Sequence, residues 1–434
     1  MTAPWYSDGG LHFGVGIEDT FVPQSRPGER AIDEYTLTEH DVRWHDDLAL
    51  AHAAGATFVR WGIPWYQIAP ERGTWKWDWV DAVMARFGEL DLRPIVDLLH
   101  YGTPLWLERE FDNPDFPEHF AEFGARVAER YTDVANDYTP INEPMIHALF
   151  CGDYAYWPPY LSGDDGLVRM SLQLARGFVG VQRAIADVAS NDVAFVHVDA
   201  GMRYEGDVEA PEHRELVARL RQQVWLVEDL VTGRVGPDHP LATFLTSHGA
   251  NDADLAMFQV RPVEPDVVGV NYYPRHSTEI FERGVSHRGG FADPRPTRDD
   301  GVTGLLELLD DAQSRYGKPV MVSETCVTAS VAIREAWMTD SIAALAAARG
   351  AGAEIVGYTW WPLFDMYEWT YRHSAAPRED HRLRMGLWEL AEGAGGLERV
   401  KTPLVDAFHR HATSDRHRPK IRSIPKASAP RDKE

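Results

Sequence analysis

The sequence predicts an α/β fold, a single closed (β/α)8 barrel of the TIM-barrel type. Eight short apolar segments have the length of strands, and stretches with helical spacing lie between them. The chain of 434 residues also has the size that such barrels reach when their loops carry insertions. We assign the barrel domain to residues 1–415, and we expect residues 416–434, rich in Lys, Arg, Pro and Ser, to be a disordered basic tail.

The elements follow one another in the alternating order of a parallel barrel. Strands are expected at Leu11–Ile17, Thr57–Ile63, Pro94–His100, the stretch that ends at Asn142, Val193–Asp199, Asp266–Tyr273, Pro319–Glu324 and Glu354–Trp361. Helices are expected at Glu39–Ala54, Asp78–Leu90, Phe116–Tyr131, Leu167–Ala189, Pro211–Leu230, Gly304–Tyr316, Val331–Arg349 and Pro403–His411. Three connections, at residues 18–38, 150–166 and 274–300, are longer than a barrel needs, and such loops usually carry function or are disordered.

Composition excludes several classes of partner. The formal net charge of -24 would repel nucleic acid and anionic membrane surfaces. Two cysteines, Cys151 and Cys326, cannot build a disulfide framework, and no Cys/His spacing resembles a zinc site. The first residues lack a basic region followed by an apolar core, and no apolar run has membrane-spanning length. We therefore expect a cytoplasmic protein without metal or cofactor; whether it forms a homo-oligomer is left open.

Two carboxylates are the first candidate site residues. Glu143 follows an apolar stretch in the run Thr139-Pro140-Ile141-Asn142-Glu143-Pro144, and no strand continues through that proline. Glu324 ends the short apolar strand that begins at Pro319. An isolated Asn-Glu-Pro would equally suit an ordinary loop, but the carboxyl ends of barrel strands share one face and carry catalytic residues. The two glutamates are thus expected on the same face.

The other strand ends add polar and aromatic side chains to this face. Singly, each would suit a structural role, but together they suit a sugar, whose hydroxyls need polar partners and whose C–H faces stack on aromatic rings. These residues are Glu18, Arg60, His100, Asn142, Asn271, Tyr273 and Trp361. The expected partner is a small-molecule glycoside or an oligosaccharide.

The motifs resemble those of family 1 glycoside hydrolases, retaining β-glycosidases built on a (β/α)8 barrel. Residues 139–144 resemble the family's acid/base motif, residues 60–65 its Arg-Phe-Ser-Ile-Ser-Trp, and residues 97–104 its Thr-Leu-x-His-Trp-Asp-Leu-Pro. Residues 269–273 match its Gly-x-Asn-Tyr-Tyr, and residues 357–369 follow its Gly-Tyr-x-x-Trp-Ser-Leu-x-Asp-Asn-x-Glu-Trp, with Pro362 and Met366 as departures. The resemblance runs from about Phe13 to about Trp369.

The resemblance implies a role for each matching residue. Glu143 is expected to be the general acid/base and Glu324 the nucleophile, supported by Arg60, Tyr273 and Asn271. The residues expected to contact the sugar are Glu18, His100, Asn142, Trp361, Glu368 and Trp369. Chemistry requires the acid to stay protonated while the nucleophile stays charged, so we expect Arg60 to lower the pKa of Glu324 and a second charge to raise that of Glu143.

Two departures from the family pattern indicate a divergent branch. The first strand lacks the family's sugar-binding Gln, and Glu18 is the candidate for its place. The nucleophile motif reads Ser323-Glu324-Thr325-Cys326 where the family has Thr-Glu-Asn-Gly. Glu368 is retained, and a carboxylate there would repel a 6-phosphorylated sugar, which disfavours a phosphoglycosidase.

Three alternatives stay open. One is a catalytically silent carbohydrate-binding relative, against which the retention of both glutamates argues. Another is a transglycosidase, which sequence does not separate from a hydrolase. The third is a nucleotide-binding oxidoreductase, suggested only by the glycines of residues 9–14, which do not form the Gly-x-Gly-x-x-Gly fingerprint.

Overall fold

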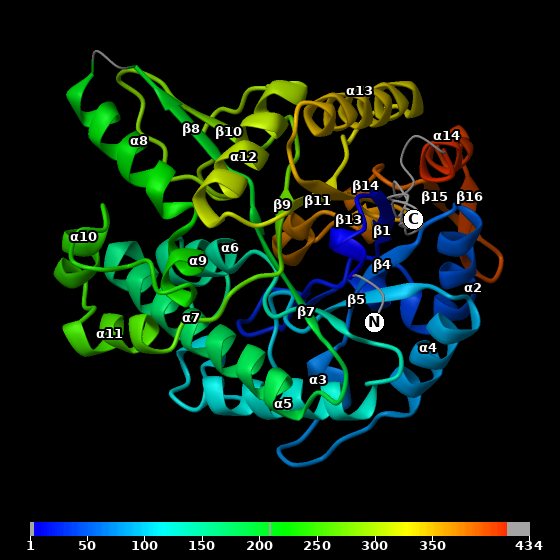
Figure 1. The fold of residues 1–434 in the computed structure, drawn as a ribbon, viewed down its shortest axis with the longest axis horizontal. Coiled ribbons are helices and arrows are strands. Elements are labelled where there is room, and N and C mark those ends of the chain that lie inside the picture. The colour runs from blue at the N-terminus through cyan, green and yellow to red at the C-terminus, as the bar shows by residue number, and fades with distance from the viewer. Residues whose placement is uncertain (1–3, 208–209, 415–434) are drawn as a thin grey trace, which may run out of the picture.

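The computed structural model describes residues 4–207 and 210–414 and confirms the predicted barrel. Eight parallel strands close in the order β1-β12-β11-β9-β7-β6-β5-β4 (Figure 1). Their bounds are β1 His12–Gly16, β4 Phe58–Gly62, β5 Arg93–Asp97, β6 Asp137–Thr139, β7 Ala194–Ala200, β9 Val267–Asn271, β11 Val320–Thr325 and β12 Ile355–Trp360. Every strand overlaps its predicted segment. The tail expected at residues 416–434 lies outside the described residues.

Helices surround the barrel, and most follow the predicted segments (Figure 1). The bounds are α1 Glu34–Leu37, α2 His40–Ala53, α3 Trp65–Ile68, α4 Asp78–Glu89, α5 Phe116–Arg130, α6 Pro144–His147, α7 Gly163–Val188, α8 Pro211–Gln223, α9 Leu226–Val231, α10 Ala242–Ser247, α11 Asp252–Val260, α12 Gly301–Tyr316, α13 Val331–Gly350 and α14 Pro403–Ala412. The helix predicted from Pro211 to Leu230 is interrupted between α8 and α9, and the short helices α1, α3, α6, α10 and α11 were not predicted. None of the helices among the described residues combines the length and apolar character needed to cross a membrane.

Four small two-stranded sheets lie outside the barrel, and they were not predicted. They pair β2 Phe21–Val22 with β3 Ile32–Asp33, β8 Arg203–Gly206 with β10 Thr278–Phe281, β13 Met366–Tyr367 with β14 Arg382–Leu383, and β15 Trp388–Gly393 with β16 Gly396–Lys401. Three of these strands lie inside long connections noted in the sequence. The sheets therefore shape the loops at the barrel's carboxyl end as well as its flank.

The barrel interior is filled by side chains from alternate strand positions. Phe58, Ile95, Val198 and Met321 belong to one buried apolar cluster, which also includes Trp5. Glycine is required opposite Phe58, because a Cβ on Gly14 would lie 2.1 Å from the phenyl ring. The packed interior leaves the strand ends and loops as the place for a site.

A bulge in β11 separates the packed interior from the site. The register with β9 shifts between Val322 and Glu324, and the register with β12 shifts between Val322 and Thr325. A bulge re-aims the side chain that it carries and is frequent beside active sites. Here it places Glu324 at the carboxyl end of the barrel, where the chain after β6 places Glu143.

Glu110, in the short turn Glu110–Asp112, makes the fold sensitive to pH. Its side chain is buried, and burial raises the pKa of Glu110 to about 8, against the opposite effect of Arg372. The folded protein therefore holds a proton that the unfolded chain releases near its ordinary pKa of 4.5. That stabilising effect is complete below this ordinary value and is lost as the pH rises through the folded value.

We expect Glu110→Gln to raise the thermal midpoint relative to wild type at about pH 9 and to leave it unchanged at about pH 4, because glutamine carries no charge that must be buried. Thermal unfolding at the two pH values measures the difference. The exposed neighbour Glu108, changed to Gln, is the matched control. An equal change at both pH values would contradict the titration of Glu110.

Candidate active site

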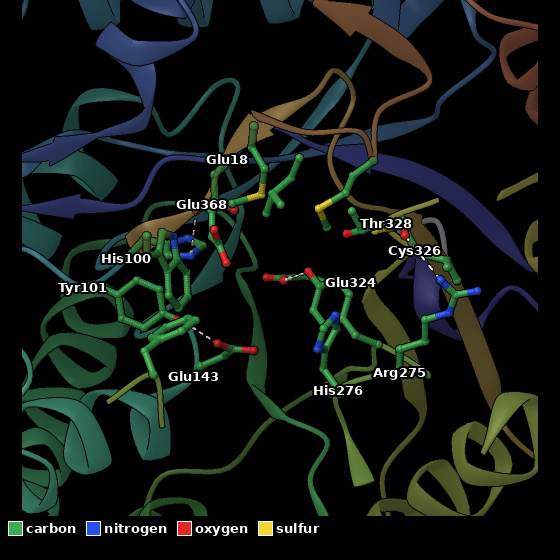
Figure 2. Close-up of a pocket in the computed structure, with 17 residues that line it drawn as sticks. Glu18, His100, Tyr101, Glu143, Arg275, His276, Glu324, Cys326, Thr328 and Glu368 are labelled. Atoms are coloured by element: carbon green, nitrogen blue, oxygen red, sulfur yellow. Dashed lines mark hydrogen bonds and ion pairs between the residues drawn. The ribbon is translucent and has the colours of Figure 1, made fainter. Parts of the chain in front are cut away.

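A cavity of about 320 Å³ opens at the carboxyl ends of the barrel strands. Figure 2 shows the carboxyl groups of Glu143, Glu324 and Glu368 directed toward its centre. The predicted site residues that line it are Glu18, His100, Glu143, Tyr273, Glu324, Glu368 and Trp369. The other predicted residues lie beneath this lining and contact it: Arg60, Asn142, Asn271 and Trp361. The structure therefore brings the sequence-predicted residues together in two layers.

Glu143 is held by a strained turn between β6 and α6. Its backbone has φ 45° and ψ 58°, in the left-handed region that non-glycine residues rarely adopt, and Pro144 begins the helix behind it. The amide of Glu143 donates to the carbonyl of Val198 at 3.1 Å, which ties the turn to β7. Such strain persists only where the surroundings determine it, and it is concentrated at functional sites.

Two donors hold the Glu143 carboxyl group. Asn271 Nδ2 donates to Oε1 at 2.9 Å, and the hydroxyl of Tyr101 donates to Oε2. Asn271 was expected to support the nucleophile; it lies opposite Glu324 in the β9–β11 register, and its side chain contacts Glu143. It lies at the end of β9, where its Oδ1 also accepts from the hydroxyl of Ser323 at 2.7 Å. Tyr101 was not singled out in the sequence.

Glu324 has a separate set of donors. Arg60 Nη1 donates to Oε1 at 2.9 Å, and the hydroxyl of Tyr273 donates to Oε2 at 2.6 Å. Both contacts agree with the roles expected for these two residues. Arg60 is fully buried and also donates to Asp97 at 2.7 Å, so its single charge is shared between two carboxylates.

The two carboxyl groups titrate together. Burial raises the pKa of Glu324 to about 8; Arg60 acts in the opposite direction, and the charge of Glu143 adds to the rise. Burial also raises the pKa of Glu143, against the effect of the Tyr101 and Asn271 donors. We expected Arg60 to keep the pKa of Glu324 low, and this is wrong for the free protein. Burial raises the pKa of Glu324 by more than Arg60 lowers it, because Arg60 also pairs with Asp97. Near neutral pH the pair therefore holds a proton.

Asn142 links the two donor sets. Its Oδ1 accepts from Arg60 Nη2 at 2.9 Å and from Asn271 Nδ2 at 3.2 Å, so its Nδ2 faces His100 Nε2 at 3.0 Å. His100 Nδ1 lies 2.7 Å from Asp19; burial lowers the pKa of His100, but Asp19 and the other carboxylates near it together outweigh burial and raise this pKa to about 10. Asn142 thus connects the residues that hold Glu143 with those that hold Glu324.

Glu18, the candidate for the place of the family's glutamine, lies just beyond β1 and lines the cavity. Its Oε1 accepts from the amide of Thr20 at 3.2 Å and from the hydroxyl of Thr20, and its Oε2 accepts from Trp361 Nε1 at 2.8 Å. Three of the roughly four acceptor positions of a carboxylate are thus used within the protein. The Trp361 ring packs on Gly16, where a Cβ would lie 1.8 Å from the ring.

The outer part of the cavity comes largely from loops. Glu368 accepts from the hydroxyl of Thr370 at 2.7 Å and lies beside Trp369 in the chain. The long connection after β9 supplies lining residues that sequence reasoning did not name: Arg275, His276 and Phe291. The loops around β11, β13 and β14 add Cys326, Val327, Thr328, Met366, Leu383 and Met385. For Arg275, His276 and Phe291 the only signal in the sequence was the length of the loop at residues 274–300.

One group of side chains in the described part of the chain brings potential metal ligands together. Ligand atoms of Asp19, Asp97 and His100 lie within 4.8 Å of one another. Arg60 already donates to Asp97, and His100 Nδ1 lies against Asp19. The positions next to these carboxylates are therefore taken by the protein's own cations and N–H groups, and we assign no metal to them.

Comparison with known proteins points to one family. The sequence model of glycosyl hydrolase family 1 matches residues 5–212. A β-galactosidase of Sulfolobus acidocaldarius is 25% identical over 313 residues, which cover 64% of this chain and 59% of that protein. Beta-glucosidase 16 of Arabidopsis thaliana is 23% identical over an alignment of 458 residues, with 89% of this chain and 84% of that protein covered.

A solved structure shows the same fold. The β-glucosidase from Thermotoga maritima in complex with azafagomine superimposes with a TM-score of 0.72 at 18% sequence identity. The match covers 93% of this chain and 97% of that one. At this identity the likeness concerns the fold, and it agrees with the closed barrel described above.

Proposed function

The chain belongs to glycosyl hydrolase family 1, and on that premise we propose that it is a retaining β-glycosidase that hydrolyses a small-molecule glycoside or an oligosaccharide. The observation that carries this proposal is the pair Glu143 and Glu324, which face one cavity while each is held by its own donors. Two carboxyl groups in different environments are what double displacement at an anomeric carbon requires.

In the first step Glu324 attacks the anomeric carbon while Glu143 gives its proton to the departing oxygen. The C–O bond to the aglycone breaks, an ester bond to Glu324 forms, and Glu143 is left as a carboxylate. The proton of the pair belongs on Glu143 in this step, because only Glu324 contacts a guanidinium. The Tyr273 hydroxyl, which donates to Oε2 in the free protein, is placed to hold the oxygen that does not attack.

In the second step water replaces the aglycone. Glu143 takes a proton from this water, the water oxygen bonds to the anomeric carbon, and the ester to Glu324 breaks. The configuration of the product equals that of the substrate. If a sugar hydroxyl enters in place of water, the same step becomes transglycosylation. Product analysis in the presence of added sugars measures the ratio of hydrolysis to transglycosylation.

The charge of the cavity favours an uncharged glycone. Glu18 and Glu368 line it together with the catalytic pair. Arg275 also lines it and lies 3.5 Å from Asp299, whereas Arg60 lies beneath the lining and is paired. An anionic glycone would meet carboxylates on several sides, so a sugar phosphate is a poor substrate. The apolar Phe291, Val327 and Leu383 at the outer wall suit an aglycone with hydrophobic surface.

The proposal is tested with a panel of nitrophenyl β-glycosides: glucoside, galactoside, fucoside, xyloside and mannoside. We expect turnover of at least one with retention of configuration, followed by NMR of the first-formed sugar. Binding of glycosides without turnover of any, natural glycosides included, would favour the silent carbohydrate-binding alternative. An exposed glutamate outside the cavity, Glu122 changed to Ala, provides the control for protein quality.

Glu18 gives a prediction on glycone recognition. We expect Glu18→Gln to lower kcat/KM by roughly 10- to 100-fold, because an amide N–H2 facing Trp361 or Thr20 leaves a buried donor without an acceptor and removes a charged acceptor from the sugar. The loss should shrink for glycosides that lack the hydroxyl donated to Glu18. Deoxy glycosides measure this, with Glu39→Gln, which does not line the cavity, as control. An equal loss on every deoxy substrate would contradict direct contact.

A further inference from the structure

The hydroxyl of Tyr101 donates a hydrogen bond to Glu143, and the family motif has no tyrosine at this position. The motif that residues 97–104 resemble has tryptophan at this position, directly after the histidine. Tyrosine carries its hydroxyl at the tip of the ring, and here that hydroxyl donates to Glu143 Oε2 (Figure 2). An indole has its N–H on the ring edge and cannot make the same contact from the same ring position.

The ring of Tyr101 is fixed from several sides. Its centroid lies 4.6 Å from that of His147, 5.0 Å from Trp157 and 5.1 Å from Trp369, and the side chain is buried. The ring thus has aromatic neighbours on several sides, and its hydroxyl donates to Glu143. The contact is therefore a built feature and not a mobile surface hydroxyl.

The backbone at Tyr101 is also strained. Tyr101 has φ 76°, in the left-handed region, and the following Gly102 packs so closely on Phe21 that a Cβ there would lie 2.3 Å from the Phe21 carbonyl oxygen. Glu143, its hydrogen-bond partner, is in the left-handed region as well. Two strained residues joined by one hydrogen bond indicate that the surroundings hold this pair in place.

We propose that Tyr101 is a positioning residue for the acid/base group: its phenol holds Oε2 of Glu143 and stabilises the carboxylate that forms when Glu143 gives its proton to the leaving oxygen. The proposal rests on the proposed function. In the first step the bond strengthens as charge develops on Glu143, because hydrogen bonds to ionised acceptors are the stronger ones. In the second step it makes Glu143 a weaker base. Tyr101 thus balances the two steps against each other.

Several charged or titratable groups face Glu143 and act on its proton together with Tyr101. Burial and the charge of Glu18 raise the pKa of Glu143, whereas the Asn271 amide and the charge of His100 lower it. Other titratable groups near it are Glu324 on β11, Asp199 on β7, Tyr273 just after β9 and His147 in α6. Among the hydroxyl donors in the described residues, Tyr101 alone contacts the Glu143 carboxyl group directly.

The test is the pH profile of Tyr101→Phe on the nitrophenyl β-glycoside that wild type cleaves best. The basic limb of kcat/KM reports loss of the Glu143 proton in the free enzyme. Removing a donor to the carboxylate disfavours the ionised form, so we expect this limb to move upward by about one pH unit. Tyr156→Phe, a half-buried tyrosine of the neighbouring loop, should leave the limb in place. An unmoved limb in a folded Tyr101→Phe protein would overturn the proposal.

A second measurement does not depend on turnover. In the Glu324→Gln background, carbon NMR of labelled glutamate follows the titration of Glu143 with and without the additional substitution Tyr101→Phe. A fluorinated tyrosine at position 101, which is a stronger donor and preserves the ring, should move the titration of Glu143 downward. No movement with either change would overturn the proposal. Movement of the titration, together with a wild-type protein that cleaves no glycoside, would instead refute the proposed function and leave the coupling of the two residues standing.

Discussion

Glu324→Gln is expected to lower kcat/KM on every cleaved β-glycoside by roughly four or more powers of ten, because the amide cannot form the ester intermediate. The amide oxygen still accepts from Arg60, so the folded structure should be retained. Steady-state kinetics and the thermal midpoint measure the two properties. Glu122→Ala, at an exposed position, is the control.

Chemical rescue adds a sharper criterion to this result. In Glu324→Ala the removed side chain leaves room for azide, which we expect to attack the anomeric carbon in place of the carboxylate and to give an α-glycosyl azide. Substantial activity in Glu324→Gln, or a β-glycosyl azide from Glu324→Ala, would show that another group is the nucleophile.

Glu143→Ala is expected to separate substrates by their leaving group. For glycosides with poor leaving groups, kcat/KM should fall by about 10²- to 10⁴-fold, because the departing oxygen needs a proton. For activated nitrophenyl glycosides the first step should change little, whereas hydrolysis of the glycosyl enzyme slows for lack of a base. Rapid-mixing kinetics should therefore show a burst of nitrophenol that wild type lacks.

The pH profile of the same variant provides the check on its role. Since the basic limb of kcat/KM belongs to Glu143, that limb should disappear for activated substrates in Glu143→Ala. Equal losses on activated and unactivated substrates, with the basic limb retained, would contradict the acid/base assignment.

Much of the fold followed from the sequence because the barrel strands are short and apolar while the helices repeat at their own spacing. The strand pattern located β6 and β11, and the prolines and carboxylates at their ends located Glu143 and Glu324. Residues of the outer sheets were missed although one signal existed: alternating side chains on either side of a glycine-rich turn in β15 and β16.

The sequence predicted most members of the site and the contacts of Arg60 and Tyr273 to Glu324, but not the other contacts. Strand ends and family motifs indicated most residues around the cavity. They did not indicate that Asn271, the last residue of β9, contacts Glu143, because this contact depends on where β9 ends relative to the neighbouring strands. The raised pKa of Glu324 depends on burial and on Arg60 also serving Asp97, and neither is visible in a sequence. Tyr101 directly follows His100 at a strand end, which was the one available signal for it.

The most direct test of the whole account is to trap the covalent intermediate. A 2-fluoro β-glycoside with a good leaving group should inactivate the wild-type protein. The mass of each chain should increase by that of one fluorosugar, and peptide mass spectrometry should find the label on Glu324. Inactivation should be slowed by a competing substrate. A label on any other residue, or rapid turnover of β-glycosides with inverted products and no label at all, would contradict the central claim that Glu324 attacks the anomeric carbon.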